Sequence, residues 1–135
     1  MSHVFTVAGA EPVDLDQLAN ELRQEIDALK GSPPDKLLAA KYLNEQADVQ
    51  AFLVVVRGNE DPHTHPDGDL IVVVLEGGGY FELPSTSSRA EAPEGSTVVI
   101  PQGVCHAYFN GSPTDSVLLA TFSPLNSRAD CPLVC

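Results

Sequence analysis

Short apolar runs that alternate with turn residues make up most of the chain after residue 48, and this pattern narrows the possible folds most. The runs are rich in valine and other β-branched or aromatic residues, whereas glycine, proline, asparagine and aspartate gather between them. Runs of this length and spacing predict short strands in an all-β sandwich or barrel. No helical segment lies between them, which argues against a parallel βαβ sheet. The expected strands are 51–56, 70–75, 80–83, 97–100, 104–109 and 117–122.

The first part of the chain has the pattern of one amphipathic helix over residues 14–30. Its apolar residues recur every three or four positions and form a single stripe. We expect Asp14 to cap the first turn together with Gln17, and Gly31 with the Pro33–Pro34 pair to end the helix. The stripe must pack either on the sheet of the same domain or on a partner subunit. It consists of Leu15, Leu18, Ala19, Leu22, Ile26 and Leu29.

The segment 36–47 fits either a short helix or an edge strand, and we favour the strand because β-rich sequence follows it. A length of 135 residues suits one domain. We therefore expect an N-terminal extension over 1–48 packed on the barrel, a β-barrel over 49–125 and a C-terminal tail over 126–135.

The net charge excludes several classes of partner, and the cysteine content indicates the redox environment. Seven basic and nineteen acidic residues give a formal net charge of −12, which repels phosphate, so we expect neither nucleic acid nor a membrane as partner. No signal peptide or transmembrane run is evident. Three cysteines are an odd and sparse set, which favours a reduced, cytoplasmic setting. We expect Cys105 to be a buried structural thiol, and Cys131 and Cys135 to be a tail thiol pair that has no function or oxidises adventitiously.

Three of the four histidines are candidates for one metal site. His63 and His65 are two residues apart, so on an extended chain both rings project to the same side. His106 follows some forty residues later in a strand-like run after a tight turn. Three neutral imidazoles suit a divalent transition metal with positions left open for substrate or water. We do not expect His3 to be a ligand.

The residues around these histidines resemble the two sequence motifs of the cupin superfamily. The first motif is matched at Gly58, His63, His65 and Gly77. The resemblance implies a jelly-roll β-barrel with the metal inside near one mouth, and with the predicted helix outside the conserved part. The second motif is matched in full, at Gly95, Pro101, Gly103, His106 and Asn110.

The first motif departs from the family pattern at its acidic ligand, because Leu70 stands where the family usually has glutamate. Asp69 is next to it, but adjacent strand residues face opposite sides, so Asp69 becomes a ligand only if a bulge turns it inward. We favour a site of three histidines without a carboxylate. Tyr108 shares the parity of His106; barrel packing is the simpler role for it, but its hydroxyl could also face the cavity.

The resemblance implies a metal-dependent enzyme that acts on a small organic molecule, with a dioxygenase as the leading reaction. We expect Fe²⁺ first, with Zn²⁺, Ni²⁺, Mn²⁺ or Cu²⁺ as alternatives, and with an isomerase, lyase or cyclase as the non-redox choice. Asp69 and Tyr108 are the candidate catalytic residues. The other hypotheses are a non-catalytic cupin module that binds a sugar or metabolite, and a structural storage protein. We also expect a homodimer.

Overall fold

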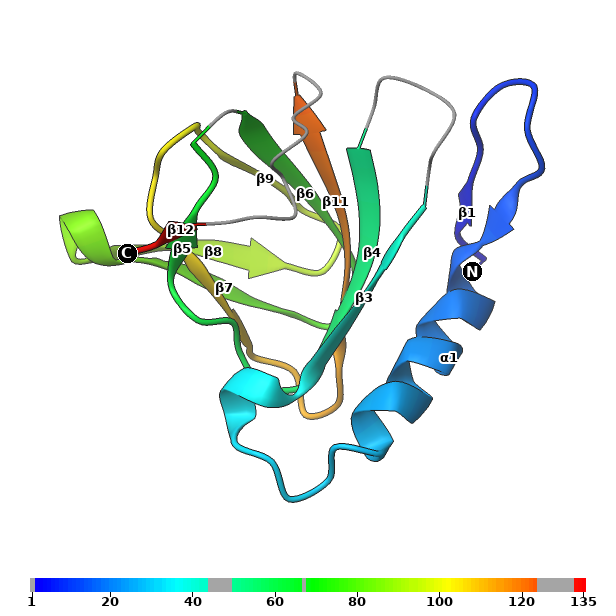
Figure 1. Cartoon of the computed structure of the whole chain (residues 1–135), viewed down its shortest axis with the longest axis horizontal. Coiled ribbons are helices and arrows are strands. Elements are labelled where there is room, and N and C mark those ends of the chain that lie inside the picture. Colours follow the sequence, from blue (N-terminus) through cyan, green and yellow to red (C-terminus); the bar gives the residue numbers. More distant parts are fainter. Residues whose placement is uncertain (1, 44–49, 67, 124–132) are drawn as a thin grey trace.

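Two antiparallel sheets form a barrel in the computed structural model, which describes residues 2–43, 50–66, 68–123 and 133–135 (Figure 1). The larger sheet has the strand order β3-β4-β11-β6-β9, and the smaller has the order β10-β7-β8. The expected mainly β fold with an N-terminal helix is therefore confirmed. The strands are β3 (Leu38–Tyr42), β4 (Gln50–Val56), β6 (Asp69–Glu76), β7 (Gly78–Leu83), β8 (Ser88–Pro93), β9 (Thr97–Ile100), β10 (Ala107–Asn110) and β11 (Ser116–Ser123).

The helix α1 (Leu15–Asp27) begins where the sequence predicts, but it ends before the predicted residue 30, and Leu29 of the predicted stripe is exposed beyond it. The Asp14 side chain accepts hydrogen bonds from the backbone N–H groups of Asp16 and Gln17, at 3.0 and 3.1 Å, and so caps the first turn. The buried stripe of α1 lies against β3 and β4 (Figure 1). The helix therefore packs on the sheet of its own chain, through Leu15, Ala19, Leu22 and Ile26.

Both faces of β4 are covered, which explains why residues 51–56 form a continuous apolar run. Leu53 and Val55 pack in the cluster under α1, whereas Phe52 and Val54 point to the barrel interior. On β6, Leu70, Val72 and Val74 are buried in the barrel core together with residues of the smaller sheet. The alternation of these strands thus builds one core beneath the helix and a second inside the barrel.

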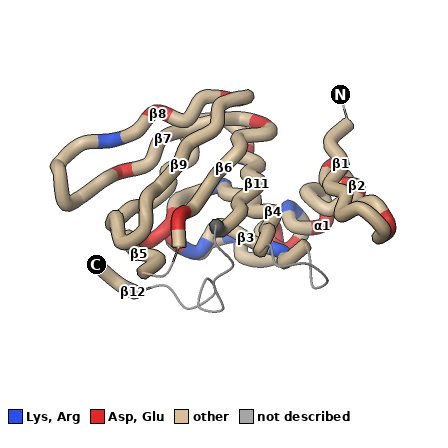
Figure 2. Tube along the Cα trace, turned by 90° about the horizontal axis from the view of Figure 1, so that it is seen from above, with Lys and Arg blue, Asp and Glu red and all other residues tan. Residues whose placement is uncertain are grey.

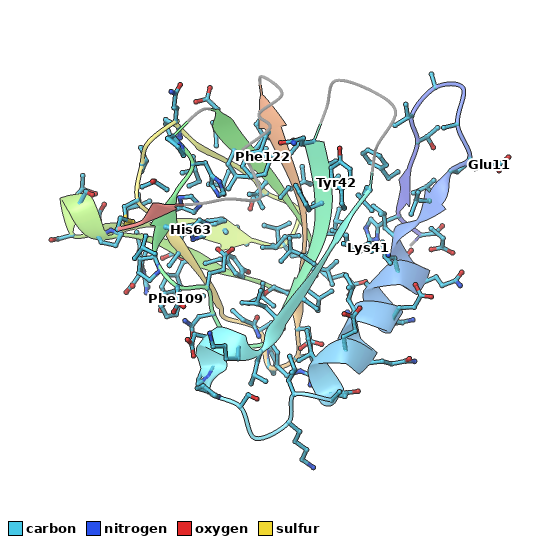
Figure 3. The ribbon with its side chains drawn as sticks, in the orientation of Figure 1. Glu11, Lys41, Tyr42, His63, Phe109 and Phe122 are labelled. Carbon is cyan, nitrogen blue, oxygen red and sulfur yellow. A yellow bond between two sulfur atoms is a disulfide. The ribbon has the colours of Figure 1, made fainter. Side chains whose placement is uncertain are left out.

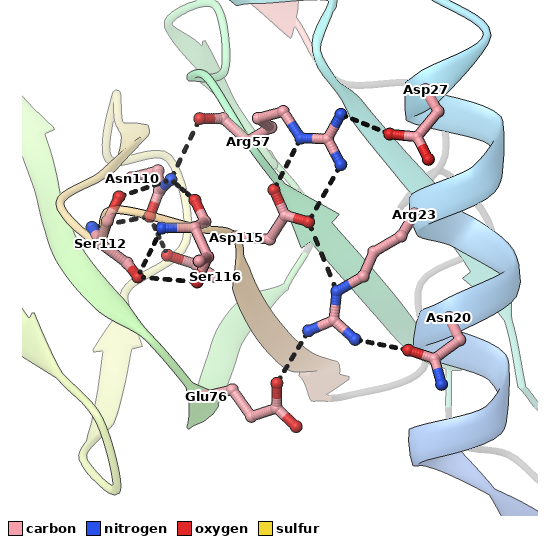
Figure 4. Close-up of polar contacts among 10 residues, drawn as sticks. Asn20, Arg23, Asp27, Arg57, Glu76, Asn110, Ser112, Asp115 and Ser116 are labelled. Atoms are coloured by element: carbon pink, nitrogen blue, oxygen red, sulfur yellow. Dashed lines mark hydrogen bonds and ion pairs between the residues drawn. The ribbon is translucent and has the colours of Figure 1, made fainter.

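Charged side chains fasten α1 to the turns at one end of the barrel (Figure 4). Asp115, only 6% exposed, accepts from the Nε atom of Arg57 at 2.9 Å and lies 3.4 Å from the Nε atom of Arg23. Arg23 also reaches Glu76, and Arg57 also reaches Asp27, both at 2.8 Å. The two carboxylates raise the pKa of Arg57 far above its ordinary value. Other acidic residues are distributed over the strands of the barrel as well as over α1 (Figure 2).

Several strands have other bounds than the sequence predicts, and several strands were not predicted at all. Segment 36–47 contains the strand that we favoured, at 38–42, while residues 44–49 are outside the described residues. The polar strand β8 was not predicted, because its residues lack an apolar run. The strand expected over 104–109 begins only at Ala107. Four two-residue strands were also missed: β1 (Val4–Phe5), β2 (Val13–Asp14), β5 (His63–Thr64) and β12 (Leu133–Val134).

The expectations of a free thiol at Cys105 and of a tail thiol at Cys135 were both wrong, because these two residues form a disulfide. Their Cα atoms lie 6.1 Å apart, although thirty positions separate the two residues in sequence. The approach depends on β12, which pairs with β5 and brings Cys135 back to the barrel. A cysteine count cannot reveal such a return of the chain. Cys131 is outside the described residues.

Candidate metal centre

Three histidines from two segments meet at one end of the barrel. His63 lies in β5, His65 follows it, and His106 immediately precedes β10. One nitrogen of each ring lies within 4.8 Å of one nitrogen of each of the others. The ring centroids are 4.4 Å apart for His63 and His106, and 5.4 Å for His65 and His106. The structure thus brings together the three histidines that the sequence singled out.

Backbone hydrogen bonds hold the two histidine segments against each other. The N–H of His63 donates to the carbonyl of His106, and the N–H of His106 donates to that of His63, both at 3.0 Å. Gly103 has a φ of 78°, which favours glycine, and its N–H donates to the carbonyl of His65 at 3.0 Å. This motif glycine therefore turns the chain so that His106 comes alongside the first pair.

The ring nitrogens are arranged as metal donors. Nδ1 of His63 lies 2.7 Å from the carbonyl oxygen of Asp61, and Nδ1 of His106 lies 2.9 Å from that of Val104. A carbonyl only accepts, so each Nδ1 carries the proton and each Nε2 keeps its lone pair. Nε2 of His106 and Nδ1 of His65 are buried without a partner. Buried nitrogens are rarely left unpaired, and a bound cation would satisfy both.

Burial keeps two of the rings neutral. The pKa of His65 is lowered to about 4, first by burial and then by the nearby rings of His63 and His106. The pKa of His106 is also lowered to about 4 by burial, although its hydrogen bond to Val104 opposes this shift. Neutral imidazole is the form that binds metal, so these two residues are ready to bind near neutral pH.

A pocket of about 410 Å³ opens beside His63 and His65. Its wall is mainly apolar, and no lysine or arginine lines it among the described residues. The ring of Phe122 packs edge-on against His65, with the centroids 4.7 Å apart; Figure 3 labels Phe122 and His63. A small ligand with an apolar body would thus be held next to the histidines. The apolar wall includes Leu38, Phe52, Val54, Leu70, Ala120 and Phe122.

Comparison with known proteins decides the family. A model of the family described as Cupin matches residues 41–130, which are 90 of the 135 residues. The chain belongs to the cupin family. An uncharacterised protein of Aquifex aeolicus (strain VF5) is 36% identical to this cupin over 114 residues, and the match covers 82% of each chain.

Solved structures show the same fold. The polyketide cyclase RemF from Streptomyces resistomycificus matches with a TM-score of 0.59 and 24% identity, over 70% of each chain. An oxalate oxidase matches with a TM-score of 0.57 and 25% identity, over 70% of this cupin and 54% of the oxidase chain. This cupin therefore spans about half of that oxidase chain.

Glu60 is a pocket residue that the sequence analysis of this cupin missed. It lines the pocket, and its Oε1 atom accepts a hydrogen bond from the backbone N–H of Tyr108 at 3.0 Å. Burial raises its pKa, while the nearby His63 and the Tyr108 hydrogen bond act in the opposite direction. The only sequence signal was an acidic residue three positions before His63, where the family motif specifies none.

Asp69 and Tyr108, the two candidate catalytic residues, lie away from the pocket lining. Asp69 is exposed, and its Oδ1 atom accepts from the backbone N–H of Gln102 at 2.8 Å, outside the group of three histidines. Tyr108 is fully buried, and its hydroxyl donates to Oγ of Ser116 at 2.7 Å. Ser116 in turn donates to Oδ1 of Asn110, so this motif asparagine has a structural contact.

His3, which we did not expect to be a ligand, lies in a second group with Asp16 and Glu76. Its Nδ1 atom is 2.9 Å from Oδ1 of Asp16, and Glu76 is paired with Arg23. The contact with His3 lowers the pKa of Asp16. These contacts make ion pairs, and they leave the group without the buried, unpartnered nitrogens that distinguish the first cluster.

Proposed function

We propose that this cupin is an enzyme that uses one divalent transition metal, held by His63, His65 and His106, to act on a small organic molecule. The leading reaction is that of a dioxygenase with Fe²⁺. The two buried ring nitrogens without a partner carry this proposal: one belongs to His65, which lines the open apolar pocket, and the other to its neighbour His106. The oxalate oxidase neighbour supports a redox reaction but leaves the substrate open.

A set of three neutral nitrogen donors leaves coordination positions free and does not reduce the charge of the ion. Bound iron would supply the redox and Lewis-acid chemistry that a dioxygenase needs. Leu70 supports this arrangement, because it lines the pocket where the family usually has the glutamate ligand. The site therefore keeps one more open position than a cupin centre with a carboxylate.

The residues of the chain bind and orient the substrate. Phe52, Leu70 and Phe122 form part of an apolar wall that fits an apolar body and excludes water from it. Glu60 is the acidic group best placed to hold a proton or to accept a hydrogen bond from a substrate hydroxyl, because it lines the same pocket and, unlike Asp61 of the same lining, is not exposed. The Tyr108 N–H fixes Oε1 of Glu60 and so orients the carboxylate.

Non-redox chemistry is the second candidate, because three imidazoles with an open position are also a catalytic zinc set. A zinc, nickel or manganese ion there would act as a Lewis acid in an isomerase, lyase or cyclase reaction. The wall without lysine or arginine, among the described residues, suits a substrate that carries little negative charge.

Elemental analysis of protein purified without chelator or nickel resin tests the proposal. We expect close to one transition-metal ion per chain, lost in His106→Ala and retained in His3→Ala, a matched histidine outside the cluster. Oxygen uptake by the iron-loaded protein is then measured with neutral aromatic substrates and with oxalate. Uptake would indicate the redox reaction, because an isomerase, lyase or cyclase reaction consumes no oxygen. If neither purification nor anaerobic reconstitution with iron, zinc, nickel or manganese yields bound metal, the enzyme proposal fails.

A further inference from the structure

We propose that the three C-terminal residues form a releasable wall of the pocket, which the Cys105–Cys135 disulfide holds in place. A thiol reductant would free this wall and widen the pocket mouth, and reoxidation would restore it. Val134 would thus be a residue that limits ligand size only in the oxidised protein. This inference concerns the pocket itself and does not depend on its activity.

The first support is the position of β12 on the segment that carries the histidines. Val134 pairs with His63 and Leu133 with Thr64, in antiparallel register. His63 uses its backbone N–H and carbonyl for His106, so the N–H and carbonyl of Thr64 face the opposite edge, where β12 lies. Figures 1 and 2 both place the C-terminus beside β5.

The second support is the position of the disulfide. Cys105 immediately precedes His106, and Cys135 immediately follows Val134. The bond therefore joins the neighbour of a candidate metal ligand to the neighbour of a pocket residue. Cys105 is 5% exposed, so its end of the disulfide is packed in the barrel, whereas Cys135 at the other end is exposed.

The third support is that few other contacts hold residues 133–135 within the described part of the chain. Val134 lines the pocket but is 93% exposed, so its side chain stands at the mouth and gains little from packing. A ladder of two residue pairs provides few hydrogen bonds against the entropy of ordering the backbone of this segment. Among the residues that the structure describes, the covalent bond is therefore the main restraint that keeps β12 on β5. Once it is broken, residues 133–135 should leave the mouth.

The redox step balances with a dithiol as reductant. One of its thiolates attacks the sulfur of Cys135, the exposed residue of the pair, the bond to Cys105 breaks, and the Cys105 thiolate takes up a proton. The second thiol of the reductant then displaces Cys135 and closes the reductant's own disulfide. Two electrons and two protons pass to the protein, which ends with two thiols.

Hydrogen exchange of the metal-free full chain tests the inference, with Cys131→Ser as the background so that only one cysteine pair can form. Peptide mapping must first find the Cys105–Cys135 bond in the oxidised protein. We expect dithiothreitol, or Cys135→Ser, to speed exchange of the Thr64 amide by about tenfold, whereas peptides of β6 and β11 keep their slow exchange. Val134→Trp should then slow the entry of an apolar dye into the oxidised pocket only.

Three results would overturn the inference: absence of the bond, unchanged Thr64 exchange after reduction, or loss of protection throughout the barrel. The last result would make the disulfide a general structural support. None of these measurements requires a bound metal, so a protein without metal would remove the proposed function and leave this test intact.

Discussion

Acid should destabilise the metal-free protein through two histidines of the cluster, and the size of the effect follows from their burial. The pKa values of His65 and His106 are about 4 in the folded protein and 6.5 in the ordinary solvated state. The unfolded chain therefore takes up protons first as the pH falls through 6.5. The stability present above pH 6.5 is lost progressively down to pH 4. Between pH 8 and pH 5 each histidine should lower the free energy of unfolding by about 2 kcal/mol.

Urea unfolding with a chelator at pH 8, 7, 6 and 5 measures this effect in the wild type and in His106→Gln, which cannot titrate. We expect the variant to lose about 2 kcal/mol less than the wild type between pH 8 and pH 5. Glu60, whose pKa is raised, contributes with the opposite sign, but it is present in both proteins and cancels in the difference. His3→Gln is the matched control and should behave as the wild type. An equal pH dependence in wild type and His106→Gln would refute the reasoning.

Four further substitutions test the site and its support. Leu70→Glu should add a carboxylate beside the histidines and tighten metal binding at least about tenfold in a chelator competition, and unchanged affinity would contradict the assigned pocket position. Asp69→Asn should keep the full metal content by elemental analysis, because this carboxylate is exposed and bonded elsewhere; a loss would make Asp69 a ligand. Asp115→Ala should lower the free energy of unfolding by about 3 kcal/mol in urea, because it leaves the Arg57 guanidinium without its buried partner. Asp27→Ala, at the exposed end of the same network, should cost less than about 1 kcal/mol, and equal losses would count against this explanation.

The patterns that predicted correctly are local ones. Alternation along 70–75 placed Leu70, Val72 and Val74 on one face, and the structure buries all three in the barrel. The helical stripe and the Asp14 cap depend on residues within one or two turns, so their spacing is visible in the sequence. The three histidines were found for a similar reason, because two lie in one short motif and the third in another.

The sequence by itself therefore determined the β-barrel class, the capped helix and the identity of the three clustered histidines. Only the tertiary structure decided that α1 packs on β4, that Glu60 lines the pocket and that Cys105 bonds Cys135. These features depend on which segments distant in the chain come to lie side by side, and no local period encodes that choice. A two-residue strand such as β12 carries almost no pattern of its own, yet its pairing with β5 places Val134 at the pocket.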